Sequence, residues 1–276
     1  MFNVKTDYVL GLTTFCNEYL NISVSGLAKL DADFVLIIYN DNPNTKLTKK
    51  HVRNLGYNGP LYIINTEHNV GVRQARLNIV KFITKKKINA QWGIFLDDDD
   101  VLINLNIPNV SDNNWAIVQN MAIVNNGMID VLRIINNPNY ELNIDGKNIE
   151  LVRPHLGLVG TPVRISLLKQ MAVLMENIKE QISDIDESVN CRPPVDEMMW
   201  AALNIIARHN DDAACPIFMD TTNYLKIDID SAAIKYGTSI RPNKCTTAQA
   251  ERIIERHNKA IVAALDAAPA GQNSEQ

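Results

Sequence analysis

The sequence predicts an α/β fold in which a central, mainly parallel β-sheet is flanked by helices. Four short apolar runs, rich in Val, Ile, Leu and aromatic residues, occur within the first 100 residues, as expected of strands buried on both faces of a sheet. Helix-like patterns separate these runs, and such alternation is typical of parallel sheets with right-handed crossovers. Ligands of such sheets gather at the carboxyl ends of the strands, so polar residues there are candidate site residues.

The elements expected in the first half follow in a regular order. Strands are expected at 7–15, 32–41, 59–67 and 91–100. Helices are expected at 17–30, at 44–56 with Asn44 or Thr45 as N-cap and Gly56 as the stop, and at 72–85. The helix at 72–85 carries apolar residues at helical spacing, which indicates that one face packs on the sheet.

Beyond residue 102, strand and helix patterns no longer alternate regularly. Helices are expected at 113–127, 162–182, 193–210 and 246–268, with a strand at 128–136 and one or two strands at 215–229. Residues 140–153 read as a hairpin that turns at Asp145-Gly146. We expect residues 1–105 and 106–245 to form two halves of one domain, followed by an amphipathic helix at 246–268 and a disordered tail at 269–276.

Composition limits the classes of function. The formal net charge of -4 predicts no general affinity for nucleic-acid phosphates. The four cysteines lack C-x-x-C spacing and are expected to be reduced, structural thiols. The first residues do not resemble a signal peptide, and no segment reaches the roughly 18 apolar residues that a membrane span needs. A cytoplasmic protein is therefore expected.

A run of four aspartates follows the fourth expected strand. In WGIFLDDDDVL, residues 92–102, apolar residues lead directly into Asp97, Asp98, Asp99 and Asp100. Side chains alternate along an extended chain, so Asp97 and Asp99 would lie on one side and Asp98 on the other. Neighbouring carboxylates repel each other, and a hard cation such as Mg²⁺ or Mn²⁺ relieves the repulsion. The run predicts a metal-binding D-x-D motif, with a solvated turn as the simpler alternative.

Four segments, one at the end of each expected strand, together resemble the nucleotide-binding half of family-2 glycosyltransferases. They read LTTFCNE, IIYNDNP, EHNVGVRQARLNI and IFLDDDD. The third and fourth resemble the family patterns N-x-G-x-x-x-A-R-N and F-L-D-x-D-D. The residues that match these two patterns are Asn69, Gly71, Ala75, Arg76, Asp97, Asp99 and Asp100.

The first two segments depart from the family patterns. Thr13 stands where Pro is usual, and Phe15 stands where Tyr is usual. Asn40-Asp41-Asn42-Pro43 replaces an acidic pair and its Gly-Ser, and Leu77 replaces the Asn of A-R-N. The resemblance covers about the first 105 residues and one later motif.

The resemblance implies a GT-A fold, which has a Rossmann-like sheet, and transfer of a hexose or pentose from a nucleoside-diphosphate sugar. Residues 1–105 would bind the donor and 106–245 would form the acceptor side. Asp99 would be a ligand of Mn²⁺ or Mg²⁺, and Asp97 would either be a second ligand or contact the ribose. The other residues implied in donor binding are Thr13, Phe15, Asp41, Asn69, Arg76 and Asp98. Of these, Asp41 would accept hydrogen bonds from the base or ribose, and Arg76 would approach the diphosphate or support the aspartates.

The later motif is an acidic pair at the start of the expected helix 193–210. Inverting members of the family use such a carboxylate as general base, which implies that role for Asp196 or Glu197, here in reversed order. Asp196 is the preferred base because it lies nearer the helix start. Trp200 could stack on a sugar, although the surrounding apolar run is more typical of a core, and His155 could lie near the acceptor or be structural.

Two alternatives remain open at the level of sequence. A haloacid-dehalogenase-like phosphatase would use Asp97 as nucleophile and Asp99 as acid, with Asp211-Asp212 as a second metal site. A catalytically degenerate protein would bind a sugar nucleotide without turnover. The acceptor is not indicated: a glycan, a lipid-linked sugar, a protein or a modified nucleic acid would each fit.

Overall fold

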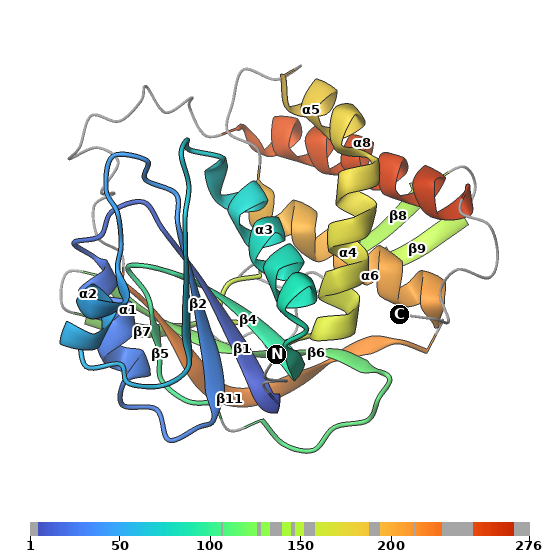
Figure 1. Ribbon diagram of the computed structural model, residues 1–276. Coiled ribbons are helices and arrows are strands. Elements are labelled where there is room, and N and C mark those ends of the chain that lie inside the picture. The colour runs from blue at the N-terminus through green and yellow to red at the C-terminus, as the bar shows by residue number, and fades with distance from the viewer. Residues whose placement is uncertain are drawn as a thin grey trace.

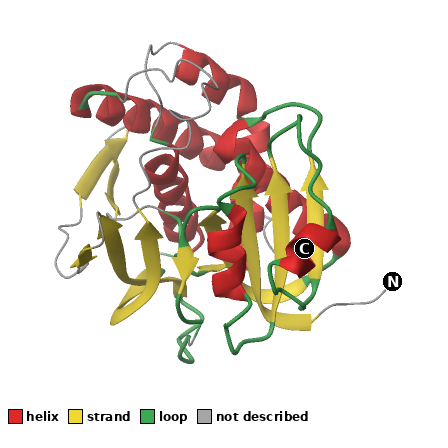
Figure 2. Cartoon of the chain, turned by 90° about the vertical axis from the view of Figure 1, so that its left-hand side faces the viewer, coloured by secondary structure: helices red, strands yellow, loops and turns green. Residues whose placement is uncertain are grey.

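The computed structural model describes residues 5–105, 107–125, 128–132, 140–144, 147–151, 158–187, 194–211, 213–227 and 245–267 (Figure 1). Its main feature is a nine-stranded mixed sheet in the order β3-β2-β1-β4-β10-β6-β11-β5, with β7 paired to β6. Figure 2 shows the strands as a curved layer with helices packed beside it. The predicted α/β class is confirmed.

The first half of the sheet is parallel. It consists of β1 (Lys5–Thr14), β2 (Phe34–Asn40), β3 (Leu61–Asn65) and β4 (Asn89–Asp97). In the register, Thr13 lies opposite Asp97, and Thr14 lies opposite Asn40. The carboxyl ends of these strands therefore meet at one edge, as the sequence predicts, and the aspartate run begins there.

The connecting helices are α1 (Leu20–Leu27), α2 (Lys49–Asn54) and α3 (Gly71–Lys86). Neither Asn44 nor Thr45 caps α2, so that prediction is wrong. Thr48 is the N-cap: its hydroxyl accepts a hydrogen bond from the His51 N–H, and the His51 side chain accepts one from the Thr48 N–H. This capping box satisfies two backbone groups near the helix start.

The helix expected at 113–127 is wrong, because residues 114–125 form strand β6 (Asn114–Asn125). A short apolar run has no decisive period, and pairing with neighbouring strands overrides the helix propensity of its Ala and Met residues. Strand β6 pairs in parallel with β11 (Cys215–Ile227) and antiparallel with β7 (Met128–Leu132) and β10 (Val163–Arg164). Residues 115–122 are all buried, as in the interior of a sheet.

Three further strands complete the second half. Strand β5 (Val101–Leu102) pairs antiparallel with β11 at the edge of the sheet. Strands β8 (Tyr140–Ile144) and β9 (Lys147–Leu151) pair antiparallel in a separate sheet, which confirms the expected hairpin. Its turn, Asp145-Gly146, lies outside the described residues.

The second half contains four described helices. They are α4 (Ile165–Asn177), α5 (Lys179–Glu187), α6 (Val195–Asn210) and α8 (Thr247–Asp266). The single helix expected at 162–182 is thus a short strand followed by two helices that break at Ile178. The expected helices at 193–210 and 246–268 are confirmed within a few residues, and the tail lies outside the described residues.

Two apolar clusters lie on opposite faces of the sheet, because alternate residues of each strand point to opposite sides. Val9 and Val35 belong to the cluster that includes residues of α3, α4, α6 and α8. Leu10 and Leu36 belong to the cluster that includes residues of α1 and α2. The sheet edge that carries the aspartates lies between these two packed layers.

The expectation that the cysteines are reduced is only partly confirmed. Cys16 and Cys215 are free thiols, as expected, whereas Cys245 is disulfide-bonded, so the expectation is wrong for Cys245. Disulfides are uncommon in reducing compartments, so the expected cytoplasmic location stays a prediction. Within the described residues, no helix combines the length and apolar character that crossing a bilayer requires.

Candidate active site

Two of the four aspartates are anchored to the fold. The Asp98 carboxylate accepts hydrogen bonds from the Thr14 hydroxyl at 2.5 Å and from the Cys16 N–H at 3.3 Å. The Asp100 carboxylate accepts hydrogen bonds from the Tyr224 hydroxyl and from the Ile227 N–H, the latter at 3.2 Å. These contacts tie the aspartate run to β1 on one side and to β11 on the other.

Burial gives these two aspartates unusual acid–base properties. It raises the pKa of Asp98 to about 7, although the Thr14 hydrogen bond acts in the opposite direction. It also raises the pKa of Asp100 to about 7, against the effect of the Tyr224 hydrogen bond. Repulsion from Asp97 and Asp99 adds to both shifts. Crowded, partly desolvated carboxylates of this kind favour a nearby cation.

Asp97 and Asp99 are both partly exposed, whereas Asp100 is buried. The Asp97 side chain is 32% exposed, and Asp99 is half-buried. Asp97 accepts a hydrogen bond from the Thr13 hydroxyl at 3.3 Å and forms an ion pair with the Arg76 guanidinium at 3.1 Å. Asp98 thus turns into the protein, whereas the predicted binding of a metal or donor by Asp97 and Asp99 stays a prediction.

Arg76 joins two distant segments of the chain. One guanidinium nitrogen binds Asp97 at the end of β4, and the other binds Asp196 in the first turn of α6. Arg76 is 1% exposed, and burial alone would lower its pKa, but Asp196 and Asp97 more than offset this and raise the pKa. The guanidinium therefore stays charged and holds both carboxylates at one place.

The two acidic residues at the start of α6 lie in different surroundings. Asp196 is 37% exposed and faces Arg76, whereas Glu197, the next residue, is exposed. Pro194 is the N-cap of α6, so both acids lie in the first turn, where the helix dipole favours negative charge. Of the two, the structure brings only Asp196 into contact with the residues around the aspartate run.

Asp41, which directly follows β2, binds the turn between β3 and α3 through its carboxylate. One of its carboxylate oxygens accepts the Val70 N–H at 2.8 Å, and the other accepts the Gly71 N–H at 2.9 Å. The Asn69 side chain accepts the same Gly71 N–H at 3.0 Å. Gly71 has φ +78°, a conformation that favours glycine. Asp41 and Asn69 therefore shape the start of α3, and their predicted contact with a donor stays a prediction.

The remaining predicted donor residues lie at the end of β1. Thr13 is buried and contacts Asp97 through its hydroxyl. Phe15 is half-buried, and its backbone carbonyl accepts a hydrogen bond from the Asn42 side chain at 2.9 Å. The loops after β1 and β2 are thus held together beside the aspartate run.

Three contacts of the site were not anticipated from sequence. The Ser23 hydroxyl, on α1, lies within hydrogen-bonding distance of the backbone carbonyls of Asp97 and Asp100, and fixes the turn between them. Tyr224 reaches Asp100 from β11, and Thr14 reaches Asp98 from β1. Ser and Thr near strand ends are too common to be a signal, and no local pattern relates Tyr224 to a residue 124 positions earlier.

Three further sequence hypotheses concern Trp200, His155 and the pair Asp211-Asp212. Trp200 is 2% exposed and packs on Trp115 with ring centroids 4.8 Å apart, so it is a core residue, as its apolar surroundings favour, and the alternative of a sugar platform is wrong. His155 and Asp212 lie outside the described residues. Asp211 follows the last turn of α6, and a rise of about 1.5 Å per residue places it roughly 22 Å from Asp196. This separation does not support a second metal site of a phosphatase near Asp97.

The described residues offer a limited set of metal ligands. Among them, no group of three or more His, Cys, Asp or Glu side chains could hold a metal ion. Asp97 and Asp99 supply oxygen atoms only, which suits Mg²⁺ or Mn²⁺ and not Zn²⁺. Mg²⁺ is commonly held by one or two carboxylates together with substrate phosphates and water. The two aspartates fit that arrangement.

The curled mixed sheet, flanked by helices, with carboxylates at the carboxyl edge of its parallel half, defines an α/β fold of the GT-A type. Comparison with solved structures agrees. The crystal structure of S. aureus TarS 1-349 superposes with a TM-score of 0.52 at 16% identity, covering 93% of this chain and 72% of that chain. TarS is a GT-A glycosyltransferase, and at this identity the likeness establishes the shared fold.

Two further solved structures are similar to this chain over less than half of their own length. A longer TarS chain superposes with a TM-score of 0.53 at 14% identity, and the match covers 92% of this chain but 43% of that chain. A structure of GalNAc-T7 with UDP, GalNAc and Mn²⁺ gives a TM-score of 0.49 at 15% identity, covering 85% of this chain and 46% of that one. No protein-family profile and no curated protein matches the sequence.

Proposed function

We propose that this chain is a glycosyltransferase that moves a hexose or pentose from a nucleoside-diphosphate sugar to an acceptor hydroxyl. The observation that carries the proposal is the buried Arg76, which holds Asp97 of the aspartate run and Asp196 of α6 together. These residues are the ones that the family resemblance assigns to donor binding and to base catalysis. The GT-A-type fold provides the matching framework.

The donor would lie at the carboxyl edge of the parallel strands. Ligands of open α/β sheets bind there, and the loops after β1 and β2 and the start of α3 surround this edge. Thr13 and Phe15 border the aspartate run, which includes Asp98, while Asn69 lies in the neighbouring turn, whose N–H groups the Asp41 side chain binds. We assign the base and ribose to this turn and the diphosphate to the aspartate run.

A divalent cation, Mn²⁺ or Mg²⁺, would be held by Asp99, with Asp97 as second ligand or ribose contact. When bound, such an ion neutralises the charge that develops on the leaving nucleoside diphosphate. Asp97 is oriented for this role by Thr13 and Arg76. Asp98 and Asp100 are already bound to the fold and serve to fix the run.

Asp196 is the proposed general base. Its carboxylate is partly exposed and is oriented by Arg76 beside the aspartate run, so it can accept the proton of an acceptor hydroxyl that attacks the donor sugar. A base opposite the leaving group permits direct displacement, which inverts the anomeric centre. Glu197 is exposed and is the alternative base.

The proposal is tested by incubating the protein with a panel of sugar nucleotides and Mn²⁺ and measuring release of nucleoside diphosphate. The account predicts metal-dependent release from one donor class, faster with the correct acceptor. A ligand that binds the folded state also raises the melting temperature, which identifies the donor independently of turnover.

Three results would overturn the proposal in different ways. Metal-dependent binding of a sugar nucleotide without release of nucleoside diphosphate, with all acceptor classes present, would identify a degenerate binding protein. Absence of any sugar-nucleotide binding, with folding verified by circular dichroism, would remove the transferase assignment altogether. Phosphate release from phosphomonoesters would instead support the phosphatase alternative.

A further inference from the structure

Strand β11 contains a bulge beside the buried strand β6. The two strands run side by side in parallel (Figure 1). Strand β11 advances five residues over Met219–Tyr224, where β6 advances two over Gln119–Met121. Bulges are common next to active sites, where they re-aim side chains. Asp220 lies in this bulge, so its side chain is placed independently of the regular alternation of the strand.

Two buried amides of β6 hold the bulge in place. Asn120 is 4% exposed and donates a hydrogen bond to the Asp220 carboxylate at 2.7 Å. Gln119 is also buried and donates a hydrogen bond to the Thr221 hydroxyl at 2.7 Å. Buried amides are costly unless they are hydrogen-bonded, and these two bond to the bulge. Asp220 is therefore fixed by the fold while it remains exposed to solvent.

An exposed aromatic ring lies beside this carboxylate. Phe218 is 49% exposed and precedes Asp220 by two residues, so their Cα atoms are at most about 7 Å apart. Phe218 pairs with Val118, which belongs to the apolar cluster on the face of the sheet that α3 and α6 cover. Asn120, two residues after Val118, points to the same face. Phe218 and the carboxylate that Asn120 holds therefore share one surface, on the face that also carries α6.

This surface is level with the aspartate run. Val163 of β10 pairs with Gly93 of β4 on one side and with Ala116 of β6 on the other. Strands β4 and β6 are both antiparallel to β10, so four residues further along each strand Asp97 and Asn120 lie at the same level. They are two strand spacings, or about 10 Å, apart. Strand β11 is one strand further from the parallel half of the sheet, where the donor would lie.

An exposed aromatic ring beside a fixed carboxylate is complementary to a sugar. The electronegative face of the ring attracts the C–H groups of a sugar, and the carboxylate accepts strong hydrogen bonds from its hydroxyls. On the basis of the proposed transferase function, we infer that Phe218 and Asp220 bind a sugar residue of the acceptor. The acceptor class is therefore a glycan.

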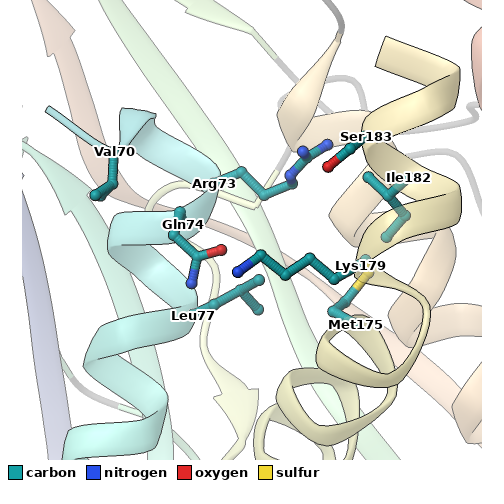
Figure 3. Close-up of a pocket in the computed structure, with 8 residues that line it drawn as sticks. All are labelled: Val70, Arg73, Gln74, Leu77, Met175, Lys179, Ile182 and Ser183. Carbon is teal, nitrogen blue, oxygen red and sulfur yellow. The ribbon is translucent and has the colours of Figure 1, made fainter. Parts of the chain in front are cut away.

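The pocket between α3 and the pair α4–α5 is a separate feature (Figure 3). Its lining residues belong to these helices and to the N-cap of α3, whereas Phe218 and Asp220 belong to β11. The glycan would bind the strand surface and not this pocket.

The binding test applies the labelled full chain to an array of oligosaccharides without sugar nucleotide. The best-bound oligosaccharide is then titrated calorimetrically into the full chain. We expect binding to oligosaccharides that share one sugar residue, because a single ring stacks on Phe218. Absence of binding to every glycan on the array would overturn the inference.

Variants locate the binding on β11. Asp220→Asn replaces the charged acceptor at nearly unchanged shape and should weaken glycan binding roughly 10- to 100-fold, as expected for one lost charge-assisted hydrogen bond. Phe218→Ala removes the ring and should weaken binding by about 10-fold or more, whereas Phe218→Tyr keeps the ring face and should bind like the wild type.

Asp31→Asn and Val173→Ala are the matched controls, because Asp31 and Val173 are an exposed acid and an exposed apolar residue outside β11. Both should bind the glycan like the wild type, and melting curves establish that all variants are folded. Equal affinities for Asp220→Asn, Phe218→Ala and the two controls would place the glycan elsewhere and contradict the inference.

Failure of this inference is distinguishable from failure of the proposed function. Glycan binding that depends on Phe218 and Asp220, without any sugar-nucleotide binding, would support the glycan surface and remove the transferase assignment. Sugar transfer to a peptide or nucleic acid, with no glycan bound, would support the transferase and overturn the glycan surface.

Discussion

Asp99 illustrates how neighbouring residues of one type acquire different roles. Asp98 and Asp100 are held by hydroxyl and backbone N–H donors, and Asp97 is held by Thr13 and Arg76. Asp99 is half-buried, and its charge helps to raise the pKa values of both Asp98 and Asp100. A cation relieves such repulsion between carboxylates, so we propose Asp99 as the first metal ligand.

Replacement of Asp99 by Asn tests this assignment. The variant should lose metal-dependent turnover, while its melting temperature should be unchanged or higher, because one repulsive charge beside Asp98 and Asp100 is removed. Nucleoside-diphosphate release in Mn²⁺ and thermal melting measure the two properties. Full activity of the variant under strict chelation would rule out the role.

His257, on α8, makes a separate prediction about stability and pH. It is fully buried, and within the described part of the chain neither ring nitrogen has a hydrogen-bond partner. Burial, and to a lesser extent Arg73, lowers the pKa of His257 to about 3. The unfolded chain binds this proton near pH 6.5, so the free energy of unfolding should fall as the pH drops from about 6.5 toward 3, by up to about 1.4 kcal/mol per pH unit.

His257→Leu should remove this contribution at similar side-chain volume. Asp98 and Asp100 have raised pKa values and so contribute the opposite slope, but both proteins share it, and the difference between them isolates His257. We expect the variant to melt at a higher temperature than the wild type, by a margin that grows from pH 8 to pH 5. A margin independent of pH would contradict the assignment.

At the level of elements, helix α3 is held at its start by Asp41 and also carries Arg76, which contacts the aspartate run. Asp41 accepts both the Val70 and the Gly71 N–H, two groups that would otherwise be orphans at the helix start. Arg76 projects from the second turn of the same helix to Asp97 and Asp196. The position of α3 therefore sets where the two carboxylates meet.

Asp41→Asn should destabilise the protein, because an amide offers one acceptor oxygen where the carboxylate offers two. Loss of one such bond costs about 1–2 kcal/mol, which in a chain of this size corresponds to roughly 2–8 °C in melting temperature. The control is Asp31→Asn, an exposed aspartate outside this turn, which should melt like the wild type. Equal melting of both variants would show that Asp41 does not hold α3.

Comparison of the expected and observed strands and helices shows which elements sequence patterns can predict. Strands β1 to β4 and helix α3 are predicted to within a few residues, because the strands are short continuous apolar runs that alternate regularly with helix patterns, and α3 has an apolar stripe at helical spacing. Strand β6 is mistaken for a helix, since its apolar residues suit either form and only pairing with β10 and β11 decides. The break at Ile178 lacks a Gly or Pro that would mark it.

At the level of the whole molecule, the candidate site is assembled from segments far apart in the chain. Arg76 and Asp196 are 120 positions apart, and Tyr224 and Asp100 are 124 positions apart. The sequence identifies Asp97, Arg76 and Asp196 individually, through strand ends and through resemblance to a family. It does not predict that one buried guanidinium joins them, because that contact depends on how α3 and α6 pack on the same face of the sheet.

The most direct test of the account compares Asp196→Asn with Glu197→Gln in one assay of sugar transfer. General-base catalysis contributes on the order of 100- to 10,000-fold, so Asp196→Asn should lower turnover by about that factor with little change in donor affinity, whereas Glu197→Gln should remain near wild type. The product should have the anomeric configuration opposite to that of the donor. Near-normal turnover of Asp196→Asn, or a product that retains the donor configuration, would contradict the account.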